Sequence, residues 1–340
     1  MRVTMSTTVD DSGVPRLRVG DAIESGFDWV EEHLGEFFGR VADVIETSVD
    51  GLTDLLNSPP MLAMAAVLAL LAWLARNWKL GLGSMAGLVL VIGMDQWPNA
   101  METLSLVFVA AVVALLVAIP VGILAARYDR VSRTVRPVLD LMQTMPAFVW
   151  LVPAVTLFSI GVSAGLVATV IFALPPGVRL TELGIRQVDK EIVEAGHAFG
   201  GTPRQILGGI QLPLALPTVM AGVNQVIMLA LSMAVIAGLV GGGGLGSEVT
   251  TSIARLDLAL GFEAGLSVVI LAIYLDRVTA SIGGRGPTQG GLLAFLLRRG
   301  RARGRTPAAV TSGDTTDVSG DGSSGPTPTQ EEHSPAGRGA

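Results

Sequence analysis

Few side chains in this 340-residue sequence are of the kinds that perform catalysis or bind metals. The chain has no cysteine, which excludes disulfides, thiolate nucleophiles and sulfur-ligated zinc. Its histidines, His33, His197 and His333, are too far apart in the sequence to predict a metal cluster. The run "GGGGLGSE" at 241–248 lacks the lysine of a phosphate-binding loop, so we expect a flexible external turn there. We therefore expect no catalytic residue, no metal and no cofactor bound by this chain.

The composition instead favours a lipid environment. Half of the residues are hydrophobic, only 15% are charged and the mean hydropathy is +0.58, whereas soluble domains are about 25% charged. The net charge of -6 gives no reason to expect a nucleic-acid partner. The sequence predicts an all-α membrane protein, a polytopic helical bundle of about seven transmembrane helices.

The transmembrane helices are predicted from apolar segments separated by short polar connections. We expect them near 61–75, 80–95, 101–126, 138–160, 163–178, 214–240 and 262–280. Small residues such as Ala110, Ala111 and Ala114 would let neighbouring helices approach closely. The ionisable residues near these segments lie toward their ends, which argues against a proton relay: Glu102, Asp140, Glu263, Asp276 and Arg277.

Charge predicts the orientation and the domain boundaries. Lysine and arginine are concentrated in alternate connections, which places those connections and the C-terminus in the cytoplasm and the N-terminus outside the cell membrane. The opening residues lack the apolar segment of a secretory signal, so we expect the N-terminus to be retained. The predicted regions are an acidic amphipathic extracytoplasmic region (1–60), two additional transmembrane helices (61–96), a transmembrane transport domain (97–282) with a cytoplasmic loop at 182–213, and a basic, then disordered cytoplasmic tail (283–340). Within the first region, apolar residues recur with helical period over 21–56 and predict a helix packed against the external side.

The polar stretch "EAGHAFGGTPRQILGGIQLP" at 194–213 interrupts the apolar segments. Apolar residues at 188, 192, 195 and 199 predict a short helix that Gly200 and Gly201 end. Thr202 suits a helix N-cap and Pro203 a first helical residue, so a second short helix is predicted from Pro203 to about Gln211. Such a hairpin with an apolar stripe could bind a partner or could pack beneath its own bundle, and spacing alone does not decide between them.

The same stretch resembles the cytoplasmic signature of ABC-importer permeases. The matching residues are Glu194, Ala195, Gly196, Gly200, Ile210, Leu212 and Pro213. The departure is Gly196, where alanine is usual. The resemblance implies a coupling loop that docks in a cleft of a separate ATPase subunit, which would use the ATP and magnesium. We expect Glu194 to anchor this loop, Gly200 to permit the turn, and Ile192 and Phe199 to supply the buried contact.

Further segments, at 139–153, 171–185, 212–246 and 270–277, resemble the permease subunit of glycine betaine/proline-type importers. The resemblance implies the type I (MetI-like) permease fold and no ATPase site in this chain. It also implies a homodimer of permeases, two ATPase subunits and an extracytoplasmic solute-binding protein. The expected cargo is glycine betaine, proline or a related quaternary-ammonium compatible solute. A stand-alone channel or secondary carrier for osmolytes is the alternative.

A translocation path is predicted along two of the apolar segments. Since the chain is only 5% aromatic, we expect high-affinity recognition of a quaternary ammonium group to belong to the binding protein. Prolines permit helix bending, so the residues expected to line or hinge the path are Met145, Pro146, Phe148 and Trp150, together with Leu174, Pro175 and Pro176.

Overall fold

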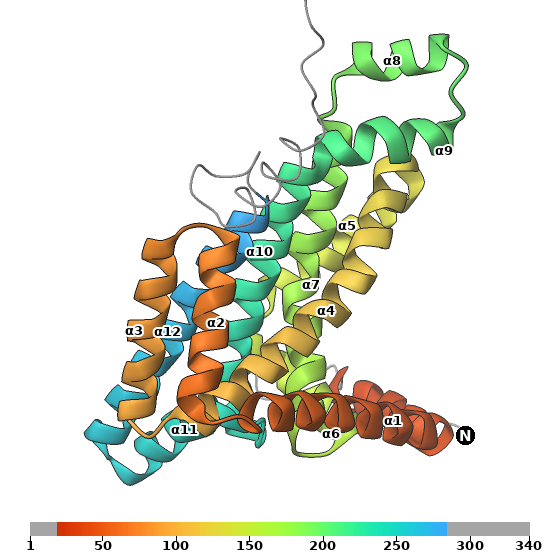
Figure 1. Cartoon of the computed structure of the whole chain (residues 1–340). Helices are drawn as coiled ribbons and strands as arrows, with labels where there is room; N and C mark the ends of the chain where they lie inside the picture. The colour runs from red at the N-terminus through yellow and green to blue at the C-terminus, as the bar shows by residue number, and fades with distance from the viewer. Residues whose placement is uncertain (1–18, 284–340) are drawn as a thin grey trace, which may run out of the picture. The chain divides into compact units, whose positions relative to one another are not determined.

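A computed structural model describes residues 19–283, and that part of the chain is helical with no strand (Figure 1). The elements are α1 (Val19–Asn57), α2 (Met61–Ala75), α3 (Trp78–Gly93), α4 (Trp97–Arg127), α5 (Asp129–Thr144), α6 (Ala147–Phe158), α7 (Val162–Arg186), α8 (Lys190–Ala198), α9 (Pro203–Ile206), the π-helical turn η1 (Leu207–Gln211), α10 (Leu212–Ala237), the 3₁₀ turn η2 (Gly238–Val240), α11 (Gly244–Arg255) and α12 (Leu258–Gly283). The predicted tail at 284–340 lies outside the described residues.

The centre of the bundle is built from α7 packed between α4 and α10. Small residues bring these helices together. Ala110, Ala111 and Ala114 are buried, as predicted. A methyl group added at Gly177 would lie only 2.8 Å from Cβ of Ala118 on α4 and 3.0 Å from Cγ2 of Val226 on α10. The close approach of the three backbones therefore depends on residues without bulky side chains.

The helices suited to membrane crossing agree broadly with the predicted segments. Within residues 19–283, four helices are long and apolar enough to span a bilayer: α4, α7, the continuous run Pro203–Val240 and α12. Two bent pairs, α1 with α2 and α5 with α6, could supply two more spans. The predicted segments at 61–75 and 80–95 correspond to α2 and α3, of which α3 is the shorter apolar helix.

The predicted single segment at 138–160 is wrong, because it is divided between α5 and α6. The two helices meet at an angle of 101°. Met145 and Pro146 adopt extended backbone angles, with ψ of 136° and 142°. For Met145 the reason is the proline that follows it, which disfavours the α conformation at the preceding residue. The indole Nε1 of Trp150 donates to the carbonyl of Met142 at 3.3 Å and ties the two arms together.

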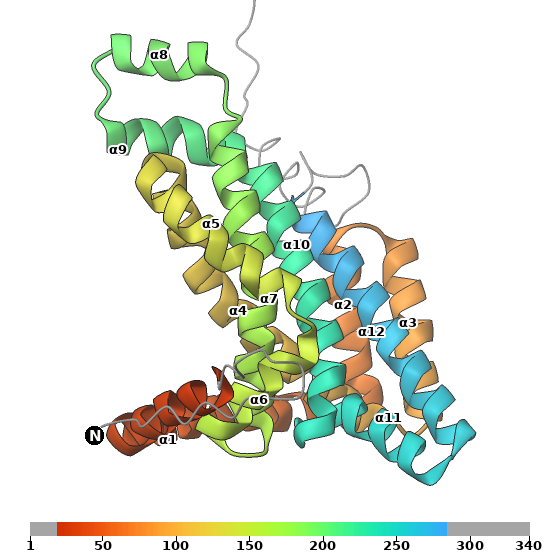
Figure 2. The ribbon, with the colours of Figure 1, turned by 180° about the vertical axis from the view of Figure 1, so that it is seen from behind.

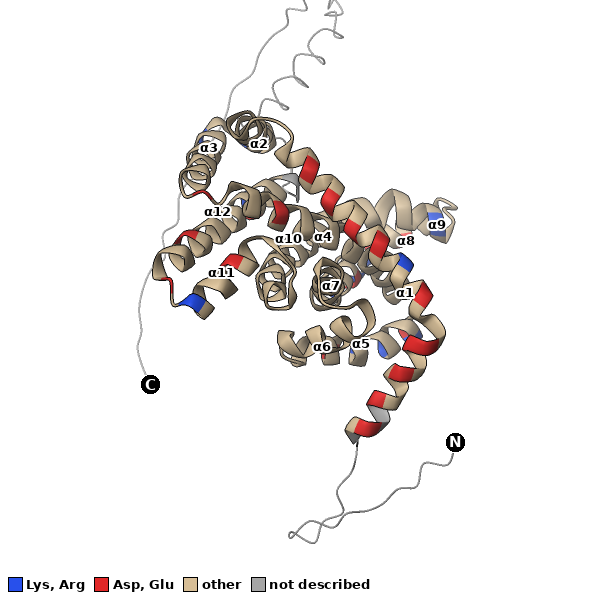
Figure 3. Ribbon diagram, turned by 90° about the horizontal axis from the view of Figure 1, so that it is seen from below, with Lys and Arg blue, Asp and Glu red and all other residues tan. Residues whose placement is uncertain are grey.

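The predicted amphipathic helix at 21–56 corresponds to α1, which contacts α4, α6 and α7. Ile45 and Val49 are buried in the main core, and Phe38 meets the ring of Phe158 edge to face at 5.3 Å. Figures 1 and 2 show α1 crossing the end of the bundle opposite α8 and α9. Acidic residues follow α1 along its length (Figure 3). The predicted packing of this helix on its own protein is therefore confirmed for its central turns.

The predicted flexible turn at 241–248 is also wrong, because Gly242, Gly244 and Gly246 are buried and the first turn of helix α11 begins at Gly244. Gly241, Gly243 and Gly244 have φ of +78°, +76° and +60°, a region that favours glycine. The amide of Gly244 donates to Oε2 of Glu102 at 2.8 Å, and the amide of Leu245 donates to Oγ1 of Thr103 at 2.8 Å. Two side chains of α4 thus satisfy the first amides of α11.

Replacing Glu102 with alanine is expected to lower the free energy of unfolding by about 1 kcal/mol, since it removes a helix-capping carboxylate. Thermal unfolding of the purified protein would measure the change. Glu263→Ala is the matched control, because the side chain of Glu263 has no hydrogen-bond partner within residues 19–283. Equal losses in the two variants would contradict the capping role.

Candidate functional site

The polar stretch forms the predicted helical hairpin, defined here as residues 190–211. Its first arm is α8, which begins at Asp189, whose Oδ1 accepts from the amide of Glu191 at 3.0 Å. The arm ends at Gly200, with φ of +80°. The amides of Gly200 and Gly201 donate back to the carbonyls of His197 and Gly196 at 2.9 and 3.1 Å. Glycine at 200 is therefore required by backbone geometry rather than by space.

The second arm begins as predicted and ends differently. Thr202 and Gln205 form a reciprocal capping box, in which the amide of Thr202 donates to Oε1 of Gln205 at 2.9 Å. Pro203 is the first helical residue. The predicted separate helix from Pro203 to Gln211 is wrong, because α9 passes into the π-helical turn η1, and η1 continues into α10 without a break. The second arm is therefore the end of a long helix.

The two arms pack through Gly196. A methyl group at Gly196 would lie 2.7 Å from Cδ1 of Ile210 and 3.4 Å from Cγ1 of Ile206. Ile206 is buried, at 3% exposed. Glycine at this position, where alanine is usual in the related signature, therefore accommodates the tip of Ile210. The predicted coupling residues Gly196 and Ile210 thus contact each other inside the hairpin.

Several apolar side chains of the hairpin point away from the bundle and are unusually exposed. Phe199 is 94% exposed and Ile192 is 44% exposed. Ala195 is exposed too, while Leu212 and Pro213 lie in the first turn of α10, where the hairpin joins the bundle. Exposed apolar residues beside charged ones are typical of a protein-binding surface.

The predicted anchor, Glu194, makes no hydrogen bond or ion pair with any residue in the described range 19–283. Its exposed side chain lines a cavity of about 250 Å³ at the base of the hairpin, together with Arg186 and Lys190. Any anchoring role of Glu194 would therefore act on another chain, and it stays a prediction.

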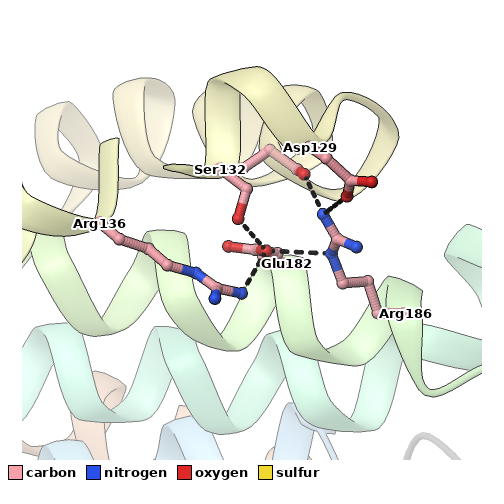
Figure 4. A network of polar contacts seen from close by, with 6 residues as sticks. Asp129, Ser132, Arg136, Glu182 and Arg186 are labelled. Atoms are coloured by element: carbon pink, nitrogen blue, oxygen red, sulfur yellow. Dashed lines mark hydrogen bonds and ion pairs between the residues drawn. The ribbon is translucent and has the colours of Figure 1, made fainter. Parts of the chain in front are cut away.

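Directly beneath the hairpin, a buried carboxylate joins α5 to the end of α7 (Figure 4). The Glu182 side chain is only 8% exposed. Its Oε1 accepts from the hydroxyl of Ser132 at 2.8 Å and from Nη2 of Arg136 at 3.1 Å, both on α5, and lies 3.0 Å from Nε of Arg186. A buried charge is tolerated where opposite charge and hydrogen bonds surround it, and Glu182 has both.

Arg186 extends the network to the corner between α4 and α5. Its Nη2 donates to Oδ1 of Asp129 and to the carbonyl of Ala125, each at 2.8 Å. A further ion pair, the third between α5 and α7, joins Arg179 of α7 to Asp140 of α5. Together these contacts fix α5 along the last turns of α7. Residues 182–186, placed in the cytoplasmic loop by the sequence analysis, belong to these turns of α7.

The arginines of this network were predicted only as determinants of orientation, and their pairing with Glu182, Asp129 and Asp140 was not predicted. A signal was nevertheless present. Along α5 the paired charges run negative, positive, negative at positions 129, 136 and 140. Along α7 they run positive, negative, positive at 186, 182 and 179. Two antiparallel helices with complementary charges at helical spacing would pair in this way.

The predicted path residues are not brought together in this chain. Met145 and Pro146 form the corner between α5 and α6, Phe148 is 56% exposed, and Trp150 is partly buried across the bend. On α7, Leu174 packs with Leu139 and Val178, and Pro175 and Pro176 are buried. The helix continues through both prolines. The lining and hinge roles stay predictions.

Replacing Gly200 with aspartate is expected to strain the turn by about 1 kcal/mol, because residues with a Cβ disfavour φ of +80°. The bundle should stay folded, since open space surrounds this position. If the hairpin is the coupling loop that the resemblance implies, the ATPase activity of the assembled transporter should lose its coupling to solute uptake. The ratio of solute imported to ATP hydrolysed in proteoliposomes would measure the change. Gly39→Asp, at an exposed position of α1 with open space around it and outside the hairpin, is the control. Unchanged coupling in the Gly200 variant would make the hairpin an inert connection.

The chain resembles known transport proteins over most of its length. Residues 118–283 match the family described as "Binding-protein-dependent transport system inner membrane component". The glycine betaine transport system permease protein OpuAB of Bacillus subtilis is 44% identical over 269 residues, 79% of this chain and 95% of that protein. The glycine betaine/proline betaine permease protein ProW of Escherichia coli is 46% identical, over 77% of this chain and 74% of that protein. The glycine betaine/carnitine permease protein GbuB of Listeria monocytogenes is 43% identical, over 81% and 99%.

The fold has a match among solved structures. An inward-facing structure of the MetNI methionine ABC transporter aligns with a TM-score of 0.51 and 24% identity, over 54% of this chain and 93% of the matched chain. That likeness concerns the fold alone, and it agrees with the predicted MetI-like permease fold. The identity of 43–46% to three permeases, together with the family match of residues 118–283, shows that this chain belongs to the family of inner-membrane components of binding-protein-dependent transport systems and is a membrane-spanning permease of that family.

Proposed function

We propose that this permease carries glycine betaine or a related quaternary-ammonium compatible solute into the cell. Three relatives that are at least 43% identical over most of their lengths are named for glycine betaine transport, one also for proline betaine and one for carnitine. These solutes share a quaternary ammonium group, whose positive charge is permanent because the nitrogen carries four carbon substituents and no proton. The substrate class rests on this similarity.

The hairpin at 190–211 would bind a separate ATPase subunit. The single observation that carries this assignment is Phe199, an aromatic side chain 94% exposed at the tip of a rigidly capped hairpin. Closure of two ATPase subunits would move two such hairpins. The continuous helix from η1 to α10, together with the Glu182 network on α5 and α7, would transmit that motion to the bundle.

The assignment of the hairpin to ATPase binding also sets the orientation of the chain in the membrane. If the hairpin faces the cytoplasm, α1 lies on the extracytoplasmic side, because it crosses the opposite end of the bundle (Figures 1 and 2). That end would meet the solute-binding protein. A second copy of this chain would complete the translocation path, to which the exposed Phe148 would contribute.

The test is reconstitution into proteoliposomes. The permease together with its ATPase subunit and solute-binding protein should import radiolabelled glycine betaine in the presence of ATP and magnesium, whereas the permease alone should import none. Uptake by the permease alone would contradict the proposal and favour the stand-alone channel or carrier. ATP-dependent uptake of a different solute by the full complex would overturn only the substrate class.

A further inference from the structure

A cavity outside the coupling site lies between α3 and α12, with a volume of about 280 Å³. It is lined by Lys79, Leu80, Gly83, Ser84, Gly87, Ile270, Ile273, Tyr274 and Arg277. Lys79 is the second residue of α3, and Arg277 lies within the last two turns of α12. Both therefore lie toward the end of the bundle that carries the hairpin (Figures 1 and 2). The rest of the lining is mainly apolar.

The two cationic groups of this cavity are poorly neutralised. Lys79 is exposed and makes no ion pair within residues 19–283. Nε of Arg277 lies 3.9 Å from Oδ2 of Asp276, at the outer limit of an ion pair. Asp276 is engaged elsewhere, because its Oδ1 accepts from Nδ2 of Asn224 on α10 at 3.0 Å. The cavity therefore presents positive charge that lacks a close anionic partner.

Glycines shape the rest of the cavity into a groove. Gly87 lets α12 approach, since a methyl group there would lie 3.0 Å from Cγ2 of Ile270. Gly83, one turn nearer Lys79, faces open space, with no atom within 4 Å of a Cβ built there. The hydroxyl of Tyr274 is already satisfied by the carbonyl of Leu68 at 3.1 Å. An apolar groove thus leads away from two positive charges.

An exposed tryptophan lies beside the cationic end of this groove. Trp78, next to Lys79, is 58% exposed, and exposed tryptophan is typical of the membrane interface. Toward the bilayer interior, Leu82 and Ile273 are exposed apolar residues on the two helices. Cations at the interface above an apolar groove fit the two parts of one lipid molecule.

We propose that this cavity binds the phosphate of an anionic phospholipid, held by Lys79 and Arg277, with an acyl chain lying in the groove past Gly83. Basic pockets between transmembrane helices favour acidic headgroups because each cation near the surface adds to the attraction. A zwitterionic lipid offers the same chain but carries a compensating cation. The site is separate from the hairpin and from the path, and only its assignment to the inner leaflet rests on the proposed orientation.

Native mass spectrometry of the purified full chain would test the proposal. The protein is loaded with equal amounts of phosphatidylglycerol and phosphatidylcholine of the same chain length, and the retained lipids are counted. The unmodified protein should prefer phosphatidylglycerol, and the double variant Lys79→Gln/Arg277→Gln should lose that preference about tenfold. Arg130→Gln/Arg133→Gln is the matched control, since it removes two exposed arginines from α5 at the same end of the bundle.

A second variant distinguishes the contribution of the apolar groove to lipid binding from that of the two cations. Gly83→Leu fills the open space beside Lys79 while leaving both cations in place, so it should reduce retention of both lipids. Equal retention of the two lipids by the unmodified protein, or an equal loss in the Arg130/Arg133 control, would overturn the proposal. Displacement of the lipid by glycerol phosphate at equal concentration would also overturn it, because the site would then recognise a free phosphate. None of these outcomes bears on solute transport.

Discussion

Replacing Glu182 with glutamine is expected to destabilise the end of the bundle that carries the hairpin and to weaken coupling. The change leaves Arg136 and Arg186 without their shared carboxylate. We expect the free energy of unfolding to fall by about 2 kcal/mol, less than the ~3–5 kcal/mol of a fully buried pair, because the two arginines are 61% and 36% exposed. Chemical denaturation of the purified protein in detergent would measure the loss.

The Glu182 network also positions the hairpin, so we expect the same substitution to change the ATPase activity of the transporter. Basal ATPase activity of the assembled transporter should persist in Glu182→Gln, while stimulation by the solute-loaded binding protein should fall about tenfold, because the buried contact between α5 and α7 is lost and only their more exposed ion pairs remain. The control is Asp140→Asn, which removes a more exposed ion pair farther along α5. A thermodynamic cycle with Arg136→Gln tests the contact itself. If the double variant loses the sum of the two single losses, the two side chains do not interact.

Replacing Phe199 with alanine is expected to weaken binding of the ATPase subunit about 30-fold, the loss typical of an aromatic hot spot worth about 2 kcal/mol. Stability of the permease should be unchanged, because the ring makes almost no contact within its own chain, being 94% exposed. Titration of the immobilised permease with the purified ATPase subunit would give the dissociation constants.

The matched control for this prediction is Phe262→Ala. Phe262 is 73% exposed in the first turns of α12, at the end of the bundle opposite the hairpin. Removing the same ring there should leave the affinity for the ATPase unchanged. If both variants bind the ATPase as tightly as the unmodified protein, Phe199 is not the contact and another part of the hairpin surface must supply it.

Local patterns in the sequence predicted much of this fold. Apolar periodicity gave α1 and the helices α2, α4, α7, α10 and α12 to within a few residues, apart from the extra turns at the end of α7. Specific residues gave the hairpin, since Thr202, Pro203 and Gly200 act through their own backbone geometry. Such signals depend on neighbours in the sequence, so a single chain is enough to detect them.

The features that were missed depend on contacts distant in the sequence. The bend between α5 and α6 was missed because the last two turns of the amphipathic helix α5 and the apolar helix α6 together resemble one apolar segment. The turn at 241–244 is ordered by Glu102 and Thr103, more than 130 residues away. From the sequence alone Glu182 would be expected at the surface. In the structure it is buried, because α5 packs over it and places Ser132 and Arg136 within hydrogen-bonding distance. The local sequence predicts which helix or turn contains each residue, whereas the side chains that it contacts depend on helices distant in the sequence.

The π-helical turn η1 has a consequence for how the hairpin is aimed. A π turn contains one residue more than the α-helical turn it replaces. If residues 207–211 wound as an ordinary α-helix instead, with no residue removed, the extra residue would turn α8 by roughly 100° about the axis of α10. Phe199 would then face a different side of the bundle, although every side chain of the hairpin would be intact. The π-helical winding of this one turn therefore sets the direction in which the hairpin projects from the bundle.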